Sequence, residues 1–188
     1  MVRSRALIQI PAACALALSL AGCGAENPKP APAPTKSASA SSSPSGEVAP
    51  TLPPEARGTD EAAAKAFVRH YFALLSYAAR TGKVTQLKAA ASSKCRSCSR
   101  VTSKIVQIYN AGGRLTGHGY ELRGSPVRQG KSSGDEVTLR VDVMQFRQIE
   151  IASAGAQPKT YPPSKLPSLL TLVRSGTDSW VVQKWTRA

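Results

Sequence analysis

Two cysteines spaced three residues apart, Cys95 and Cys98, are the side chains best suited to covalent chemistry in the middle of the chain. At the start of a helix this spacing puts their Cα atoms about 5 to 6 Å apart, within the range that a disulfide spans. A thioredoxin-like redox pair would need a βαβ context, which the surrounding sequence lacks. Zinc would need two more ligands, and the only histidines are His70 and His118. Which of the three chemistries applies depends on the compartment.

The N-terminal residues indicate that compartment. A basic start at residues 1–5 precedes a mostly apolar stretch at residues 6–20, which is typical of a secretion signal and shorter than the ~20 apolar residues of a membrane-spanning helix. The tetrapeptide Leu20-Ala21-Gly22-Cys23 resembles a bacterial lipobox, in which the cysteine thiol receives a diacylglyceryl group before cleavage ahead of it. We expect residues 1–22 to be removed and Cys23 to anchor the protein in the cell membrane, on its extracytoplasmic face. The alternative is a simple secretory signal in which Cys23 is incidental.

Export favours the first of the three cysteine chemistries. Cysteine pairs in exported proteins are oxidised by default, so we expect a structural Cys95–Cys98 disulfide. The redox pair and the zinc site remain as alternatives.

The remaining polar residues form no recognisable catalytic group. His70 lies on the edge of an apolar helical stripe, and His118 lies between two glycines. Glu121 and Glu150 are the acids that no turn, helix start or solvent-facing strand position accounts for, and neither has a motif around it. No Ser-His-Asp order, phosphate loop or carboxylate pair is visible, so we expect no enzyme activity, no cofactor and no metal.

Charge is the strongest remaining feature. The formal net charge of +14 falls to +12 without Arg3 and Arg5 of the signal, and residues 23–58 are balanced, so the excess lies beyond residue 58. Arg96, Arg100 and Lys104 recur every four residues, on a helix side turned away from the apolar stripe. Together with Lys94 they predict an anion-binding helix start, against the alternative of a generally solvated basic face. Nucleic acid is disfavoured as a partner, because no aromatic residues interleave with the stripe and the protein is exported.

Two amphipathic helices must position these groups. Residues 59–82 show an apolar stripe that contains Tyr71, with Thr59 as the expected N-cap and Gly82 as the stop. Residues 96–113 show a second stripe that contains Tyr109. Ahead of them, residues 23–58 are rich in Pro, Ala and Ser, which predicts a disordered tether with a reach of roughly 30 to 110 Å. We therefore expect a single domain over residues 59–188.

Antiparallel strands follow the helices. Residues 115–122 form an extended pattern that two glycines should bend, and residues 137–143 alternate apolar and polar side chains, with a change of parity at Met144 and Phe146. Residues 169–174 and 180–185 predict a terminal hairpin. Helices first and strands after them make an α+β domain, with the N-terminal helices packed on a curved antiparallel sheet.

This order of elements, with Gly176-x-x-x-Trp180-Val181-Val182 near the end, resembles the cone-shaped nuclear-transport-factor-like fold. The segments AFVRHYFALLSYAARTG, CRSC and IYNAGG are similar to an uncharacterised lipoprotein domain family of high-GC Gram-positive bacteria. The resemblance implies a sheet that wraps the first helix and leaves an open pocket, and it implies no established activity.

The sequence thus predicts a surface-tethered, non-catalytic binding protein. Its candidate partners are a cell-wall polymer, an anionic lipid or an envelope protein, and Tyr71 and Tyr109 are the candidate pocket residues. A small enzyme and a scaffold without a ligand are the alternatives. A buried carboxylate facing a histidine would favour the enzyme, and a filled interior would favour the scaffold.

Overall fold

The computed structural model describes residues 46–131 and 133–188. The expected signal peptide, Cys23 and most of the tether lie outside these residues. The rest of the tether, residues 46–58, contacts the domain. It contains a 3-10 turn, η1 (Pro54–Ala56), in which Ala56 is fully buried against the core. The folded part of the chain therefore includes residues that composition alone assigned to the tether.

Helix α1 (Glu61–Thr81) is the long central helix. Asp60 is its N-cap, one residue after the expected Thr59, and its carboxylate accepts the Ala63 N–H at 2.7 Å. Gly82 ends the helix in the left-handed conformation, as the sequence predicts, with φ of 74°. Twelve of its side chains are buried, and they cover more than one face of the helix. Helix α1 must therefore be surrounded by other elements.

A short helix α2 (Thr85–Ala89) leads to α3 (Arg96–Asn110). Helix α3 buries Cys98, Thr102, Ile105 and Ile108 on one side and exposes the other. It stops at the expected glycines: Gly112 has φ of 72°, and the Gly113 N–H donates to the Ile108 carbonyl at 2.9 Å.

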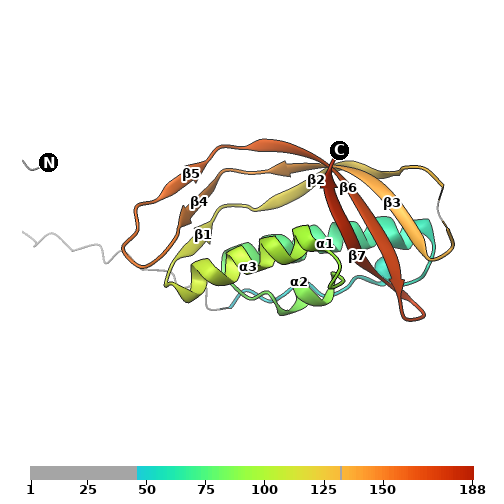
Figure 1. The fold of residues 1–188 in the computed structure, drawn as a ribbon, viewed down its shortest axis with the longest axis horizontal. Coiled ribbons are helices and arrows are strands. Elements are labelled where there is room, and N and C mark those ends of the chain that lie inside the picture. The colour runs from blue at the N-terminus through green and yellow to red at the C-terminus, as the bar shows by residue number, and fades with distance from the viewer. Residues whose placement is uncertain (1–45, 132) are drawn as a thin grey trace, which may run out of the picture. The chain divides into compact units, whose positions relative to one another are not determined.

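The strands form two antiparallel sheets. The four-stranded sheet has the order β2 (Tyr120–Arg128), β3 (Glu136–Gln145), β6 (Ser164–Ser175) and β7 (Ser179–Arg187). The three-stranded sheet has the order β1 (Arg114–Thr116), β4 (Gln148–Ile151) and β5 (Lys159–Tyr161). Each strand of the smaller sheet is followed or preceded in the chain by a strand of the larger one, and Figure 1 shows both sheets arching over α1 and α3. The α+β prediction and the packing of the helices on antiparallel sheet are confirmed; the sheet is not closed into a barrel.

The chain passes directly from one sheet to the other three times, and each time two or three residues interrupt what would otherwise be one long strand. Residues 117–119 separate β1 from β2, so the expected strand at residues 115–122 is two strands. Gly117 has φ of 128°, and a Cβ there would lie 2.3 Å from the Arg147 carbonyl oxygen. Phe146 and Arg147 separate β3 from β4, close to the predicted change of parity, and Pro162-Pro163 separates β5 from β6. The three interruptions lie side by side, because β1, β4 and β5 are neighbours in one sheet and β2, β3 and β6 are neighbours in the other. We call this line of interruptions the bend between the sheets.

The four-stranded sheet carries most of the core. Alternate side chains of β3 are buried, and β6 and β7 pair as the predicted terminal hairpin. The half-buried Trp185 packs edge-on against Phe72 of α1, with ring centroids 5.6 Å apart. The free edge of β7 is partly covered by the segment before α3, because the Val182 N–H donates to the Ala90 carbonyl and the Ser92 N–H donates to the Val182 carbonyl.

Candidate functional site: a cationic surface and an adjacent cavity

The start of α3 contains the two cysteines, Cys95 and Cys98. The two sulfur atoms lie 2.01 Å apart, at disulfide distance, with a Cα separation of 5.3 Å. Cys95 is also the N-cap residue, and its sulfur accepts the Cys98 N–H at 3.3 Å. Both residues are buried, and no group of three or more metal-ligating side chains comes together within the described parts of the chain. The pair thus holds the first turn of α3, and the role of the disulfide remains a prediction.

Basic side chains gather where this helix start meets β7. The Ser97 hydroxyl donates to the Trp185 carbonyl at 2.7 Å and joins the two elements. Two hollows, of about 370 and 360 Å³, lie beside this contact, and both are lined by residues from α3 and β7. We call this region the cationic surface; its basic residues are Lys94, Arg96, Arg100, Lys184 and Arg187.

The cationic surface is not neutralised locally. All five basic residues are exposed, and none of them forms an ion pair with another described residue. No acidic side chain lines either hollow. Three of the five, Lys94, Arg96 and Arg100, come from the predicted anion-binding set, whereas the sequence did not associate Lys184 and Arg187 with them. Their meeting creates a concentrated positive field that favours an anionic partner.

Lys104 does not belong to this surface. Its ammonium group lies 2.9 Å from the Glu150 carboxylate, which also accepts a hydrogen bond from the Tyr161 hydroxyl at 3.1 Å. Lys104 faces solvent with Arg96 and Arg100, as expected, but its charge is already paired, which the sequence did not predict. The cause is the three-stranded sheet, which brings Glu150 of β4 against α3.

Glu150 is a buried carboxylate, with a side chain only 11% exposed. Burial by itself would raise its pKa, but the hydrogen bonds from Lys104 and Tyr161 outweigh burial and hold the pKa below its usual value. The carboxylate therefore stays ionised near neutral pH. It is poorly suited to take up a proton there.

Beside this network lies a cavity of about 260 Å³ between α1, α3, β1, β2 and β4. Its wall is mostly aliphatic, and its polar part is formed by the exposed Arg100 and Lys104 together with Gln148 and Glu150. The aliphatic lining residues are Leu75, Ala79, Val101, Ile105, Ile108 and Leu115. Arg100 also lines one hollow of the cationic surface, so the cavity and that surface are neighbours.

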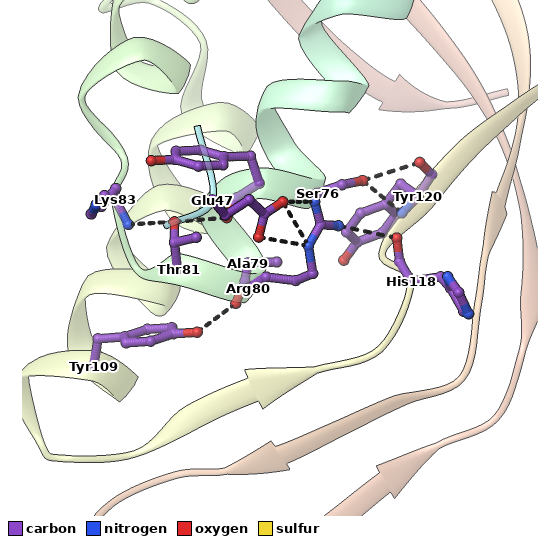
Figure 2. Close-up of polar contacts among 10 residues, drawn as sticks. Glu47, Ser76, Ala79, Arg80, Thr81, Lys83, Tyr109, His118 and Tyr120 are labelled. Carbon is purple, nitrogen blue, oxygen red and sulfur yellow. Dashed lines mark hydrogen bonds and ion pairs between the residues drawn. The ribbon is translucent and has the colours of Figure 1, made fainter. Parts of the chain in front are cut away.

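Figure 2 shows the polar contacts around the last turns of α1, where Ala79 also borders the cavity. The Ser76 hydroxyl accepts the Tyr120 N–H at 2.8 Å and donates to the Tyr120 carbonyl at 3.1 Å, which fixes β2 against α1. One turn further, Arg80 pairs with Glu47 and donates to the His118 carbonyl. The Arg80 hydrogen bond lowers the pKa of the Glu47 carboxyl. Residues that begin the described chain are thus tied to the last turn of α1.

The two candidate pocket tyrosines occupy other places. Tyr71 is 1% exposed and packs in the core between Phe72 and Trp185, where burial raises its pKa. The Tyr109 hydroxyl donates to the Ala79 carbonyl at 2.9 Å, and its ring covers Gly82. Neither is among the residues that line the cavity. Both lie on the expected helices, but Tyr71 is buried in the core and the partly buried Tyr109 packs against the end of α1.

The histidines do not approach Glu150. His70 packs beside Phe67, and burial lowers its pKa. His118 packs beside Phe146 at the bend between the sheets. The partners of the Glu150 carboxylate are Lys104 and Tyr161, so the arrangement that would favour an enzyme is not formed by these groups.

The fold and the two sites define a class of protein: a small α+β domain with helices under antiparallel sheet, a cationic surface and one mostly aliphatic cavity. The chain belongs to DUF6318, a family of unknown function whose model matches residues 34–183. A similar solved structure is the intermembrane space region of chloroplast protein ARC6, with a TM-score of 0.54, 12% identity, and coverage of 68% of this chain and 95% of that one. At this identity the likeness concerns the fold alone. No curated protein matches the sequence.

Among the described helices, none has both the length and the apolar character that crossing a membrane requires.

Proposed function

We propose that the protein is a lipid-anchored lipoprotein of the extracytoplasmic membrane face, whose folded domain binds an anionic component of the cell envelope without catalysing a reaction. The observation that carries this proposal is the convergence of five basic side chains from α3, its preceding turn and β7, with no acidic side chain among them. The lipoprotein family resemblance agrees with the membrane anchor and implies no activity for the folded domain.

An anion would remove an electrostatic cost of the fold. Lys94, Arg96 and Arg100 surround the N-terminus of α3, where positive charge opposes the helix dipole by about 0.3 to 1 kcal/mol for each exposed group. Arginine guanidinium groups make paired hydrogen bonds to phosphate or carboxylate oxygens. An anionic partner would therefore gain contacts and relieve repulsion at the same time.

The membrane anchor rests on Leu20-Ala21-Gly22-Cys23 and on the long Pro, Ala and Ser segment after it. Replacing Cys23 with Ala should release the protein into the medium, because no thiol would remain to carry lipid. Fractionation and mass spectrometry check this. A variant that stays with the membrane, or a native protein without a diacylglyceryl adduct, would contradict the anchor.

The anion-binding role is tested by removing charge in two places. One variant carries Arg96→Gln, Lys184→Gln and Arg187→Gln; its matched control carries Arg140→Gln, Arg147→Gln and Lys131→Gln, at exposed positions outside the cationic surface. Binding to vesicles with phosphatidylglycerol, and to isolated wall polymer, is measured across salt concentrations. At roughly 1 kcal/mol per basic residue near an anionic surface, the first variant should lose about 100-fold in affinity.

The control should lose only a few-fold, through net charge. Equal losses would mean that the overall charge acts without a site. An absence of binding at low salt would remove the anionic partner altogether.

The two alternatives have less support. The enzyme alternative would gain support from a buried carboxylate that faces a histidine, whereas the partners of the Glu150 carboxylate are Lys104 and Tyr161. A scaffold without a ligand would be expected to have a filled interior, whereas a mostly aliphatic cavity lies beside α3.

A further inference from the structure

The cavity beside α3 combines an apolar wall with a polar margin on one side. Six aliphatic side chains from α1, α3 and β1 line it, and its basic residues, Arg100 and Lys104, both lie on α3 and are exposed. Apolar cavities with a few convergent polar groups are the usual form of a small-molecule site. The matching ligand has an apolar body and a polar head.

The net charge at the polar margin of the cavity indicates whether the head group of the ligand is anionic or cationic. Lys104 and Glu150 compensate each other, and the Tyr161 hydroxyl adds a hydrogen bond to the same carboxylate. Arg100 has no acidic partner among the described residues. The margin therefore has an excess of one positive charge, and its free guanidinium can make a bidentate contact with a carboxylate or phosphate.

The volume of the cavity limits the size of the apolar part of the ligand. A cavity of about 150 Å³ lined by aliphatic and aromatic residues admits benzene, which has six carbons. By this measure, the 260 Å³ beside α3 hold about ten carbons. That is one hydrocarbon chain of medium length, or the first part of a longer one.

We propose that this cavity binds the hydrocarbon chain of an anionic amphiphile, with the acidic head group at Arg100. The inference deepens the proposed function, because Arg100 lines both the cavity and the cationic surface, and it makes the anionic envelope component lipid-like. A polymer without an apolar part would use the cationic surface and leave the cavity unused.

A chain-length series tests the proposal on the unaltered cavity. The Cys23→Ala protein, which carries no lipid of its own, is titrated with alkanoates of four to fourteen carbons below their micelle concentrations, and binding is followed by calorimetry. Affinity should rise about fourfold for each methylene group, as expected for burial of a CH₂, and should level off near ten carbons. A flat series, or a rise that continues through fourteen carbons, would overturn the cavity as the site.

The head group is tested with ligands of equal length. Decanoate should bind at least tenfold more tightly than decanol and more tightly still than decylamine, and Arg100→Gln should remove most of this preference while keeping the dependence on chain length. Equal binding of decanol and decanoate would overturn the role of Arg100. Lys131→Gln, at an exposed position that lines neither region, is the control.

Filling the cavity gives an independent check. Ala79 is 3% exposed and lines the cavity, so Ala79→Leu should lower decanoate affinity at least tenfold while leaving the salt-dependent binding of anionic vesicles measurable. If this variant does not fold, the chain-length series still decides the question. An Ala79→Leu protein with unchanged decanoate affinity, or an unaltered protein that binds anionic vesicles but not decanoate, would overturn this inference alone. An unaltered protein that binds decanoate but not anionic vesicles would overturn the proposed function alone.

Discussion

The four-stranded and the three-stranded sheet both pack on the helices, but they pack differently. The four-stranded sheet forms a tightly packed core with them, whereas the three-stranded sheet leaves a cavity. In the four-stranded region the buried inward side chains are aliphatic or aromatic apart from the small Ser168, and Leu139, Leu170, Leu172 and Val182 have no exposed surface. In the three-stranded region the buried inward residues are Leu115 and Glu150. A carboxylate cannot fill an apolar space, because it must keep polar partners. The comparison indicates that one charged inward position leaves a cavity within an otherwise packed domain.

The sharpest test of this comparison truncates one leucine in each region. Leu172→Ala should lower the free energy of unfolding by about 4 kcal/mol, because the tightly packed surroundings cannot close the space. Leu115→Ala should cost about 2.5 kcal/mol, since Leu115 already borders a cavity and has fewer packed neighbours to lose. Urea denaturation with the disulfide intact measures both. Equal costs would mean that the two regions are packed alike.

The bend between the regions should depend on Gly119. Gly119 has φ of 83°, and a Cβ there would lie 2.6 Å from the Ser76 hydroxyl oxygen. Gly119→Ala should therefore cost about 3 kcal/mol, from both backbone strain and the clash with α1. Gly124 is a matched control, because its φ is 75° and nothing lies within 4 Å of the added Cβ.

Gly124→Ala should cost only about 1 to 2 kcal/mol, the strain of the left-handed conformation. Thermal unfolding of both variants gives the difference. If the two substitutions cost the same, the close approach of Gly119 to Ser76 does not constrain the residue at this position.

The smallest expected effect concerns the charged network of the three-stranded region. The folded protein holds the pKa of Glu150 below the ordinary 4.5, because the hydrogen bonds from Lys104 and Tyr161 outweigh burial. Its contribution is therefore fully present above about pH 4.5, and it is lost as the pH falls through the lower, folded value. Glu150→Gln should lower the free energy of unfolding by about 1.5 kcal/mol at pH 7 and flatten the fall of stability in acid.

Glu121→Gln is the surface control, because Glu121 and Arg123 form a pair 3.7 Å apart in which both side chains are 55% exposed. It should change stability by less than about 0.5 kcal/mol at pH 7. Urea titrations between pH 3 and pH 7 compare the two variants. A Glu150→Gln protein with the acid profile of the unaltered chain would show that the network does not stabilise the fold.

Local patterns in the sequence were enough to predict the helices, their stops and the terminal hairpin. The stripe of α1 and Gly82 after it specify a helix and its end without reference to any partner, because both depend on residues within a few positions. The same holds for Cys95 and Cys98, whose sulfurs are brought to disulfide distance by a spacing of three at a helix start. The α+β class follows from the order of these elements.

Only the tertiary structure decided which residues meet at the candidate sites. Lys104 pairs with Glu150, 46 positions away, because the bend in the strands turns β4 toward α3. Lys184 joins Arg96 because β7 lies against the start of α3, and residues 46–58 pack on the domain although their composition resembles that of a tether. Periodicity shows which face of an element is apolar or charged, but it does not show which other element will cover that face. The partner is decided by strand register and by the position of the bend, and both of these depend on contacts between residues far apart in the chain.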